Sequence, residues 1–185
     1  NIQQVDNFIA SHRHHMGGTQ FVPALTQALN IPKDTEGRSR HLLVITDAQI
    51  YERNECINLA QKEFRSDNHR RISVICIDAS PNSHLVYELA EEGGGEAKFL
   101  SSDPKEGDVA STLDNLLTQW EDPIAVDMSL MVYGAEEVEV IGKKTKTTKE
   151  GVSIDLGDLP SGRSIWVCGR INKTKYPSQF QLSSK

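Results

Sequence analysis

Two aspartates stand where buried strands are expected to end, and this position favours cation binding. Asp47 directly follows Val44-Ile45-Thr46, and Asp78 directly follows Ile75-Cys76-Ile77. In a doubly wound sheet, ligands gather at the carboxyl ends of the strands, so both carboxylates are expected at one edge. Such a carboxylate could bind a hard divalent cation, and the hydroxyl of Thr19 could supply a second oxygen. The structural alternative is that each Asp caps the following turn.

The elements that would position these residues alternate between helical and strand patterns. Apolar stripes with helical spacing occur over about 2–9, 22–29, 54–65, 85–90 and 109–120. Continuous apolar runs at 41–47 and 71–78 are typical of strands buried on both faces, and 97–100 is a third, short strand. The three glycines at 93–95 are expected to end a helix. This alternation predicts an α/β fold, Rossmann-like, with a doubly wound and mostly parallel sheet.

The pattern changes after Pro123 to short strands separated by glycines. Alternating or apolar segments occur at 126–132, 138–140, 152–156 and 164–167. The charge changes at the same place: residues 1–122 carry 11 basic and 19 acidic side chains, a net charge of −8, while 123–185 carry 9 and 7, a net charge of +2. We therefore predict an α/β domain over 1–122 and an antiparallel, β-sandwich-like module of about four strands over 123–185.

Composition excludes several classes of protein. The 185 residues are 37% hydrophobic and 25% charged, which is within the range of globular proteins. The net charge of −6 argues against nucleic-acid binding, and no apolar run approaches the ~18 residues of a membrane span. Three cysteines at wide spacings argue against a zinc site or a disulfide framework and favour reduced thiols in a cytoplasmic protein. The first residue is Asn1, not Met, so the chain is expected to be part of a longer one.

The order of motifs in the first part resembles the second half of a von Willebrand factor A (vWA) domain. Gly17-Gly18-Thr19, a helix, and a strand ending in Ile45-Thr46-Asp47 correspond to the family's Gly-Gly-Thr turn and its Thr-Asp-Gly strand end. The likeness continues through 72–79 and 89–100. The resemblance implies a metal-ion-dependent adhesion site (MIDAS) holding Mg²⁺ or a similar cation, with Thr19 and Asp47 as metal ligands.

The chain departs from that family in two respects. The family's Asp-x-Ser-x-Ser motif, on its central first strand, is absent from the sequence. Ala48 and Gln49 stand where a Gly usually follows the Asp. The resemblance therefore implies that the first strands of the sheet are missing, and Thr19 and Asp47 cannot form a complete site alone. An upstream segment or a second chain would have to complete both the sheet and the site.

A shorter segment near the end resembles proteins with a vault/inter-α-trypsin (VIT) domain. Leu159-Pro160-Ser161-Gly162, leading into Ile165-Trp166-Val167-Cys168-Gly169-Arg170, is similar to the segment after the vWA domain in those proteins. There, such strands join a β-sandwich built partly from residues before the vWA domain. An ordinary turn followed by a buried strand explains the same residues equally well.

These observations predict a non-enzymatic protein-binding or scaffold module in which the cation accepts a carboxylate from a protein partner. The alternative is a Mg²⁺-dependent hydrolase or phosphotransferase using Asp47 and Asp78, for which no nucleophile or phosphate cradle is visible in the sequence. A third possibility is a purely structural interaction domain without metal. No residue is assigned a catalytic role.

Overall fold

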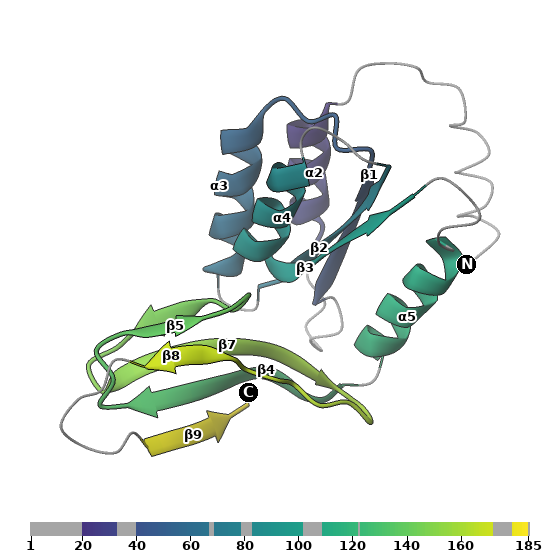
Figure 1. Cartoon of the computed structure of the whole chain (residues 1–185). Coiled ribbons are helices and arrows are strands. Elements are labelled where there is room, and N and C mark those ends of the chain that lie inside the picture. Colours follow the sequence, from purple (N-terminus) through teal and green to yellow (C-terminus); the bar gives the residue numbers. More distant parts are fainter. Residues whose placement is uncertain are drawn as a thin grey trace.

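The computed structural model describes residues 20–32, 40–66, 69–78, 83–101, 109–121, 123–171 and 179–184. Helices and strands alternate through the first part of the chain, as the apolar spacing predicts (Figure 1). These elements are α2 (Phe21–Asn30), β1 (His41–Thr46), α3 (Arg53–Phe64), β2 (Arg71–Ile77), α4 (Ser83–Glu92), β3 (Gly94–Leu100) and α5 (Val109–Glu121).

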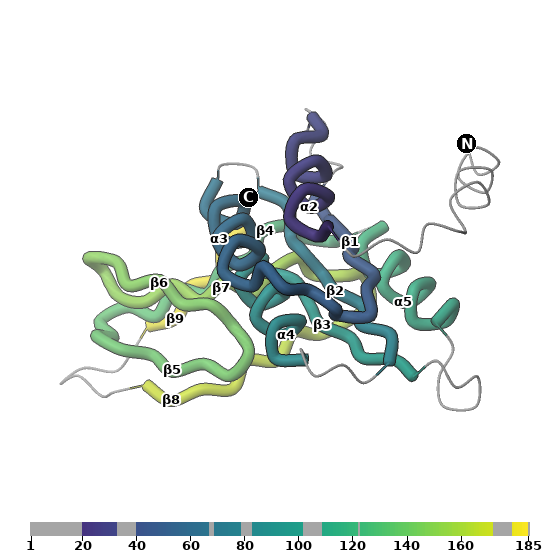
Figure 2. Tube along the Cα trace, turned by 90° about the horizontal axis from the view of Figure 1, so that it is seen from above, coloured from purple at the N-terminus to yellow at the C-terminus, as the bar shows by residue number. Residues whose placement is uncertain are grey.

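The three strands of this α/β part form a parallel sheet in the order β1-β2-β3. His41 pairs with Arg71 at the start of β1 and β2, and Thr46 pairs with Cys76 near their ends, so the two strands run in register. Helices α2, α3 and α4 lie together on one side of the sheet, whereas α5 lies across the strands from them (Figures 1 and 2). Helices therefore flank the sheet on both sides, which confirms the predicted α/β architecture.

The main core lies between the sheet and helices α2, α3 and α4. Apolar side chains spaced along each helix turn inward and meet the alternate residues of β2, because one face of a helix repeats every three to four positions. The fully buried members include Val74, Cys56, Ala60, Val86 and Leu89. The Asn54–Arg65 helix predicted from the spacing of apolar residues is confirmed within one residue at each end by α3.

The prediction that the first strand is buried on both faces is wrong. Only β2, which has a neighbour on either side, is buried along its length, whereas β1 is half-buried and Ile45 is 51% exposed. The physical reason is position: among the described residues β1 pairs with β2 alone and lies at the edge of the sheet. An apolar run in the sequence shows that a strand can be buried, but its neighbours decide whether it is.

The glycine run ends α4, as predicted, and also begins the next strand. Gly94 has φ +69, a left-handed conformation that residues with a Cβ adopt at a cost. At Gly95, an added Cβ would lie 2.2 Å from the Ile72 carbonyl oxygen. The absence of a side chain here allows β3 to approach β2 closely.

The second part of the chain is an antiparallel β-module. It contains β4 (Pro123–Tyr133), β5 (Val138–Val140), β6 (Thr145–Thr147), β7 (Gly151–Pro160), β8 (Gly169–Ile171) and β9 (Gln179–Ser183). The strand order is β6-β7-β4-β9 in one sheet, and β5 pairs with β8 in another. Residues of both sheets share a second core, which includes Val132, Val138, Val152 and Ile154. The predicted β-sandwich-like module is therefore present, with six described strands.

One local prediction in this module is wrong. Residues 164–167, predicted to be a strand, form none, Trp166 is 89% exposed, and pairing begins only at Gly169. Apolar composition alone does not make a strand without a partner strand. The predicted domain boundary between residues 122 and 123 stays a prediction.

Candidate functional site

The predicted cation-binding edge lies at the carboxyl ends of β1 and β2. Asp47 follows β1 directly and is exposed, and Asp78 follows β2 and is also exposed. Because Thr46 pairs with Cys76 in the parallel register, the chain leaves both strands at the same edge of the sheet. The structure therefore places the two predicted carboxylates at one edge, as expected from strand direction.

The Asp47 side chain also stabilises its own turn. Its Oδ1 accepts a hydrogen bond from the backbone N–H of Gln49 at 3.2 Å, and Thr46 Oγ1 accepts one from the N–H of Ala48 at 3.0 Å. Ala48 is fully buried and has φ +60, the conformation that a glycine adopts most easily. The turn thus has the backbone shape that a Gly after the Asp would have, although Ala occupies the position.

Both aspartates influence the pKa of the Cys76 thiol. Burial raises the pKa of the Cys76 thiol, and the negative charges of Asp47 and Asp78 raise it further. Both carboxylates are therefore near enough to this thiol to disfavour a thiolate. Burial likewise raises the pKa of the Cys56 thiol to about 11, with a further contribution from Glu52. Both thiols are free and buried, which is consistent with the predicted reduced thiols.

The donor set for a metal can be compared with the groups that the described residues supply. Asp47 contributes an exposed carboxylate, which suits a hard cation such as Mg²⁺. Thr19, the other predicted ligand, lies outside the described residues. Among the residues that the structure describes, no group of three or more His, Cys, Asp or Glu side chains is arranged to hold a metal ion. Asp47 is thus suited to supply one ligand of a cation site.

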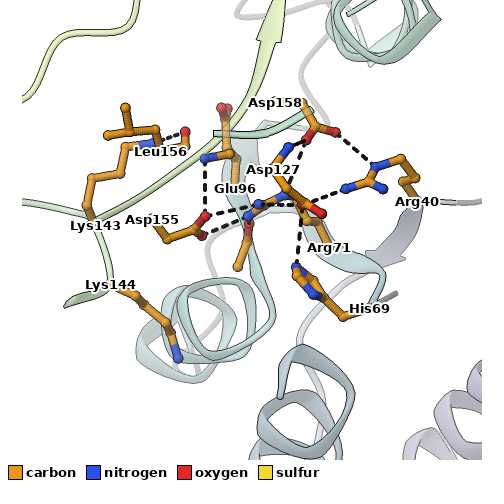
Figure 3. Close-up of polar contacts among 12 residues, drawn as sticks. Arg40, His69, Arg71, Glu96, Asp127, Lys143, Lys144, Asp155, Leu156 and Asp158 are labelled. Atoms are coloured by element: carbon orange, nitrogen blue, oxygen red, sulfur yellow. Dashed lines mark hydrogen bonds and ion pairs between the residues drawn. The ribbon is translucent and has the colours of Figure 1, made fainter. Parts of the chain in front are cut away.

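The amino ends of the same strands carry a polar network that was not predicted from the sequence. It contains three carboxylates of the β-module and two guanidinium groups of the α/β part: Arg40, Arg71, Asp127, Asp155 and Asp158 (Figure 3). Arg40 precedes β1 and Arg71 begins β2, so both lie at the amino ends of the parallel strands. The network therefore joins the two parts of the chain at the end of the sheet opposite Asp47.

Arg71 is at the centre of this network. Its side chain is only 6% exposed, and it binds Asp155 with two hydrogen bonds, Nη1 to Oδ2 at 2.9 Å and Nη2 to Oδ1 at 3.0 Å. Nη2 also lies 3.2 Å from Asp127 Oδ1, and Nη1 donates to the Gly94 carbonyl at 3.1 Å. Burial opposes the charge of Arg71, but the hydrogen bonds and charges of the aspartates raise its pKa. This bidentate geometry fixes the orientation of the β-module as well as its distance.

Asp127 and Asp158 are nearly buried and remain ionised. Burial opposes ionisation of Asp127, but the hydrogen bond and charge of Arg40, 2.5 Å away, together with Arg71, lower its pKa. Burial also opposes ionisation of Asp158. Its interaction with His41 and the hydrogen bond that it accepts from the Asp127 N–H nevertheless hold its pKa well below the usual range. The protein thus pairs charges that would be unfavourable if buried singly.

Aromatic and histidine side chains close the network on the side of α5. His41 Nε2 lies 3.3 Å from Asp158 Oδ2, and the His41 ring stacks on Trp120 with a centroid distance of 4.5 Å and an interplanar angle of 6°.

A second contact joins the α/β part to the β-module outside this network: Lys144 Nζ lies 2.6 Å from Glu92 Oε2. Burial opposes ionisation of Glu92, but Lys144 outweighs it and lowers the pKa of Glu92.

A cleft of about 740 Å³ borders the network, between β3 and α4 on one side and the β-module on the other. Its walls carry both charge signs, so charge alone does not select a class of ligand. Its lining includes Tyr87, Lys98, Trp120, Lys143, Asp155 and Arg163.

Reasoning from the sequence missed the network because its partners are far apart along the chain. Arg71 and Asp155 are separated by 84 positions, and Arg71 and Asp127 by 56. One signal was present: Asp127, Asp155 and Asp158 lie in or beside segments predicted to be strands, where unpaired carboxylates are rare.

Among the described residues, no helix is long and apolar enough to cross a membrane.

Comparison with known proteins gives a consistent answer about the fold. No protein-family model matches the chain. Two von Willebrand factor A domain-containing proteins of Dictyostelium discoideum are 24% and 23% identical to it over 180 residues, covering 89% of this chain. A third from that organism is 32% identical over 94 residues, 51% of this chain. The chain spans about a fifth of the length of the first two relatives and a tenth of the third.

A solved structure shares the architecture of almost the whole chain. The von Willebrand factor type A protein from Catenulispora acidiphila superposes with a TM-score of 0.61 at 16% identity, over 95% of this chain and 45% of that protein. The superposition includes the β-module, because the α/β part alone is too short to give that coverage. The resemblance of the β-module to VIT proteins stays a prediction. The chain thus contains a von Willebrand factor A-like α/β domain followed by an antiparallel β-module.

Proposed function

We propose that this chain is a non-enzymatic protein-binding module of the vWA type. Its carboxyl edge would recognise an acidic group of a partner through a divalent cation held partly by Asp47 and Thr19. The observation that carries the proposal is the placement of Asp47, exposed at the carboxyl end of β1 in a vWA-like sheet. In such a sheet, ligands bind at this edge.

The turn after β1 supports this role. The Gln49 N–H bond to Oδ1 holds the Asp47 carboxylate in one orientation. The second oxygen, Oδ2, takes no part in this hydrogen bond and would bind the cation. A carboxylate that is already oriented loses less conformational freedom on binding than a mobile one.

Mg²⁺ would supply a positive charge that accepts a carboxylate of the partner as its last ligand. Asp47 and Thr19 would supply two oxygens. Chain upstream, or a second polypeptide, would supply the others and would pair with the side of β1 that has no neighbouring strand among the described residues. With two protein ligands, the cation would remain mostly hydrated and weakly held, so tight binding requires those further groups.

The competing function is a Mg²⁺-dependent hydrolase or phosphotransferase that uses Asp47 and Asp78. The position of both carboxylates directly after neighbouring parallel strands favours this alternative. It needs in addition a nucleophile or a phosphate cradle, and the sequence shows neither a phosphate-loop pattern nor a nucleophile motif. We therefore place it second.

Binding of Mn²⁺ to the chain, measured by calorimetry or by paramagnetic broadening of NMR signals, tests the proposal. We expect weak binding that broadens signals around residues 46–49 and is lost in Asp47→Ala. The matched control is Asp114→Ala, since Asp114 is an exposed carboxylate on α5, away from the strand ends. Binding that is unchanged in Asp47→Ala would contradict the proposal. Binding that requires Asp78 as much as Asp47 would favour the hydrolase or phosphotransferase.

A further inference from the structure

The described sheets have six edge strands, and these differ in how well they resist pairing with another chain. Exposed strand edges are commonly protected by charge, short length or bulges. β6 is three residues long with Lys146 at its centre, and β3 carries the exposed Glu96 and Lys98. β5 and β8, the two strands of the smaller sheet, are also three residues long and carry the exposed Glu139 and Arg170. β1 is the edge that the proposed function assigns to further strands of the vWA-like sheet. The remaining edge is β9.

β9 has none of these protections. Its five residues, Gln179 to Ser183, carry no charge and no proline, and all five are exposed. Figure 1 shows β9 at the outer edge of the β-module, and among the described residues it pairs with β4 alone. One row of its backbone hydrogen-bonding groups therefore faces outward.

The side chains of β9 continue the apolar inner face of the sheet. In an antiparallel pair, residues directly opposite each other project to the same face. Phe180 is opposite Val132, which is fully buried in the core of the β-module, and Leu182 is opposite Leu130 at the margin of that core. Yet Phe180 is 60% and Leu182 is 59% exposed. The inner face thus extends beyond the layer that covers it.

The other face of β9 is held by polar contacts to β4. The Tyr133 hydroxyl donates to Gln181 Oε1 at 2.5 Å, and the hydroxyls of Ser129 and Ser183 lie 2.8 Å apart. These bonds fix the register of β9 on β4. Phe180 and Leu182 consequently lie together on the opposite face of the strand.

β9 is also complementary to itself. In an antiparallel pair of two copies centred on Gln181, Phe180 of each copy lies opposite Leu182 of the other, and Gln179 lies opposite Ser183. Apolar residues then meet apolar ones on the inner face, and uncharged polar residues meet on the outer face. No charge opposes a like charge across the pair.

We propose that the occupant of this edge is a second copy of the chain. Two β9 strands pair antiparallel about a two-fold axis and join two four-stranded sheets into one. Such an interface is isologous, because the same residues of both copies form it. Pairing two five-residue strands buries little surface beside the ~1,200–2,000 Å² that stable interfaces bury, so the dimer should be concentration-dependent.

The test measures the mass of the 185-residue chain by light scattering across a concentration series. We expect the mass to rise from 20.6 kDa toward twice that value. Phe180→Lys and Leu182→Glu each place a charge opposite an apolar residue twice per dimer. Each should weaken association about tenfold or more. The control Thr147→Lys adds the same charge to the other edge of the same sheet and should leave the dimer unchanged.

Rescue distinguishes the register. A mixture of Phe180→Lys chains and Leu182→Glu chains should form a heterodimer, because the introduced lysine then lies opposite the introduced glutamate, and Leu opposite Phe. The double variant Phe180→Lys/Leu182→Glu should dimerise with itself for the same reason. Circular dichroism confirms that each variant is folded, and rescue itself shows that the single variants fail through pairing and not through misfolding.

Two results would overturn the proposal. One is a wild-type chain that stays monomeric at every concentration. The other is an assembly that survives both single substitutions, which would locate association at another edge, such as β1. Neither result bears on cation binding by Asp47, which is measured separately.

Discussion

Arg71 is the residue whose contacts join the two parts of the chain. It begins β2, yet its guanidinium binds carboxylates of β4 and β7, and its side chain is almost completely removed from water. Three carboxylates surround two guanidinium groups in this network, so each cation compensates more than one negative charge. Removing one partner of a buried ion pair leaves a buried charge that neither water nor protein stabilises.

Replacement of Arg71 should therefore be strongly destabilising. We expect Arg71→Met to lower the free energy of unfolding by about 3–5 kcal/mol, as measured by urea denaturation. The matched control is Arg53→Met, because Arg53 pairs with Glu88 at 2.6 Å but is 50% exposed, and loss of an exposed pair costs about 0–1 kcal/mol. Equal losses in the two variants would show that burial does not govern the contribution of Arg71.

The element that depends most on a small residue is β3. It follows α4 after one residue and must lie against β2 immediately, so its first residues approach the backbone of β2. At Gly95 the Ile72 carbonyl occupies the space that a Cβ would need, and a backbone atom within a buried strand cannot move aside easily.

Gly95→Ala should displace β3 from β2. We expect a loss of about 1–3 kcal/mol in thermal or urea unfolding, the usual range for overpacking in a core. Gly142→Ala serves for comparison, because nothing lies within 4 Å of an added Cβ there and its cost comes only from the φ of +65. A Gly95→Ala protein as stable as the wild type would mean that β3 can shift without cost.

At the scale of the whole molecule, the amino and carboxyl ends of the parallel strands have different roles. The β-module is fastened to the amino ends of β1 and β2 by the Arg71 network and to the end of α4 by Lys144. Asp47 and Asp78 lie at the carboxyl ends of these strands, at the opposite end of the sheet from these contacts, and they are exposed. This arrangement leaves the proposed binding edge accessible to a partner.

The charged interface makes the stability of the whole chain depend on pH. Asp127, Asp158 and Glu92 have pKa values below those of an unfolded chain, so protonation favours the unfolded state. Their contribution is complete above the unfolded pKa values of about 4 and is lost as the pH falls through the lower folded values. We expect the urea midpoint to decrease below about pH 4. A midpoint independent of pH in that range would contradict the assignment of these pairs.

Most elements of the α/β part could be predicted from the sequence because local spacing defines them. A helix repeats its apolar face every three to four residues, and a strand buried on both faces is a continuous apolar run, so α3, β2 and α4 were found near their observed bounds. Local spacing failed where neighbours decide the outcome. Residues 164–167 are apolar but lack a partner strand, and β1 is less buried than its composition predicts because it lies at an edge.

The sequence by itself determined the α/β order of elements, the β-module and the presence of Asp47 and Asp78 at strand ends, since each follows from residues close together in the chain. Only the tertiary structure decided which surfaces meet. The pairing of Arg71 with Asp155 joins residues 84 positions apart, and no local pattern encodes a contact at that distance. The exposure of Phe180 and Leu182 was decided in the same way, because a side chain becomes buried only when another layer of the protein covers it.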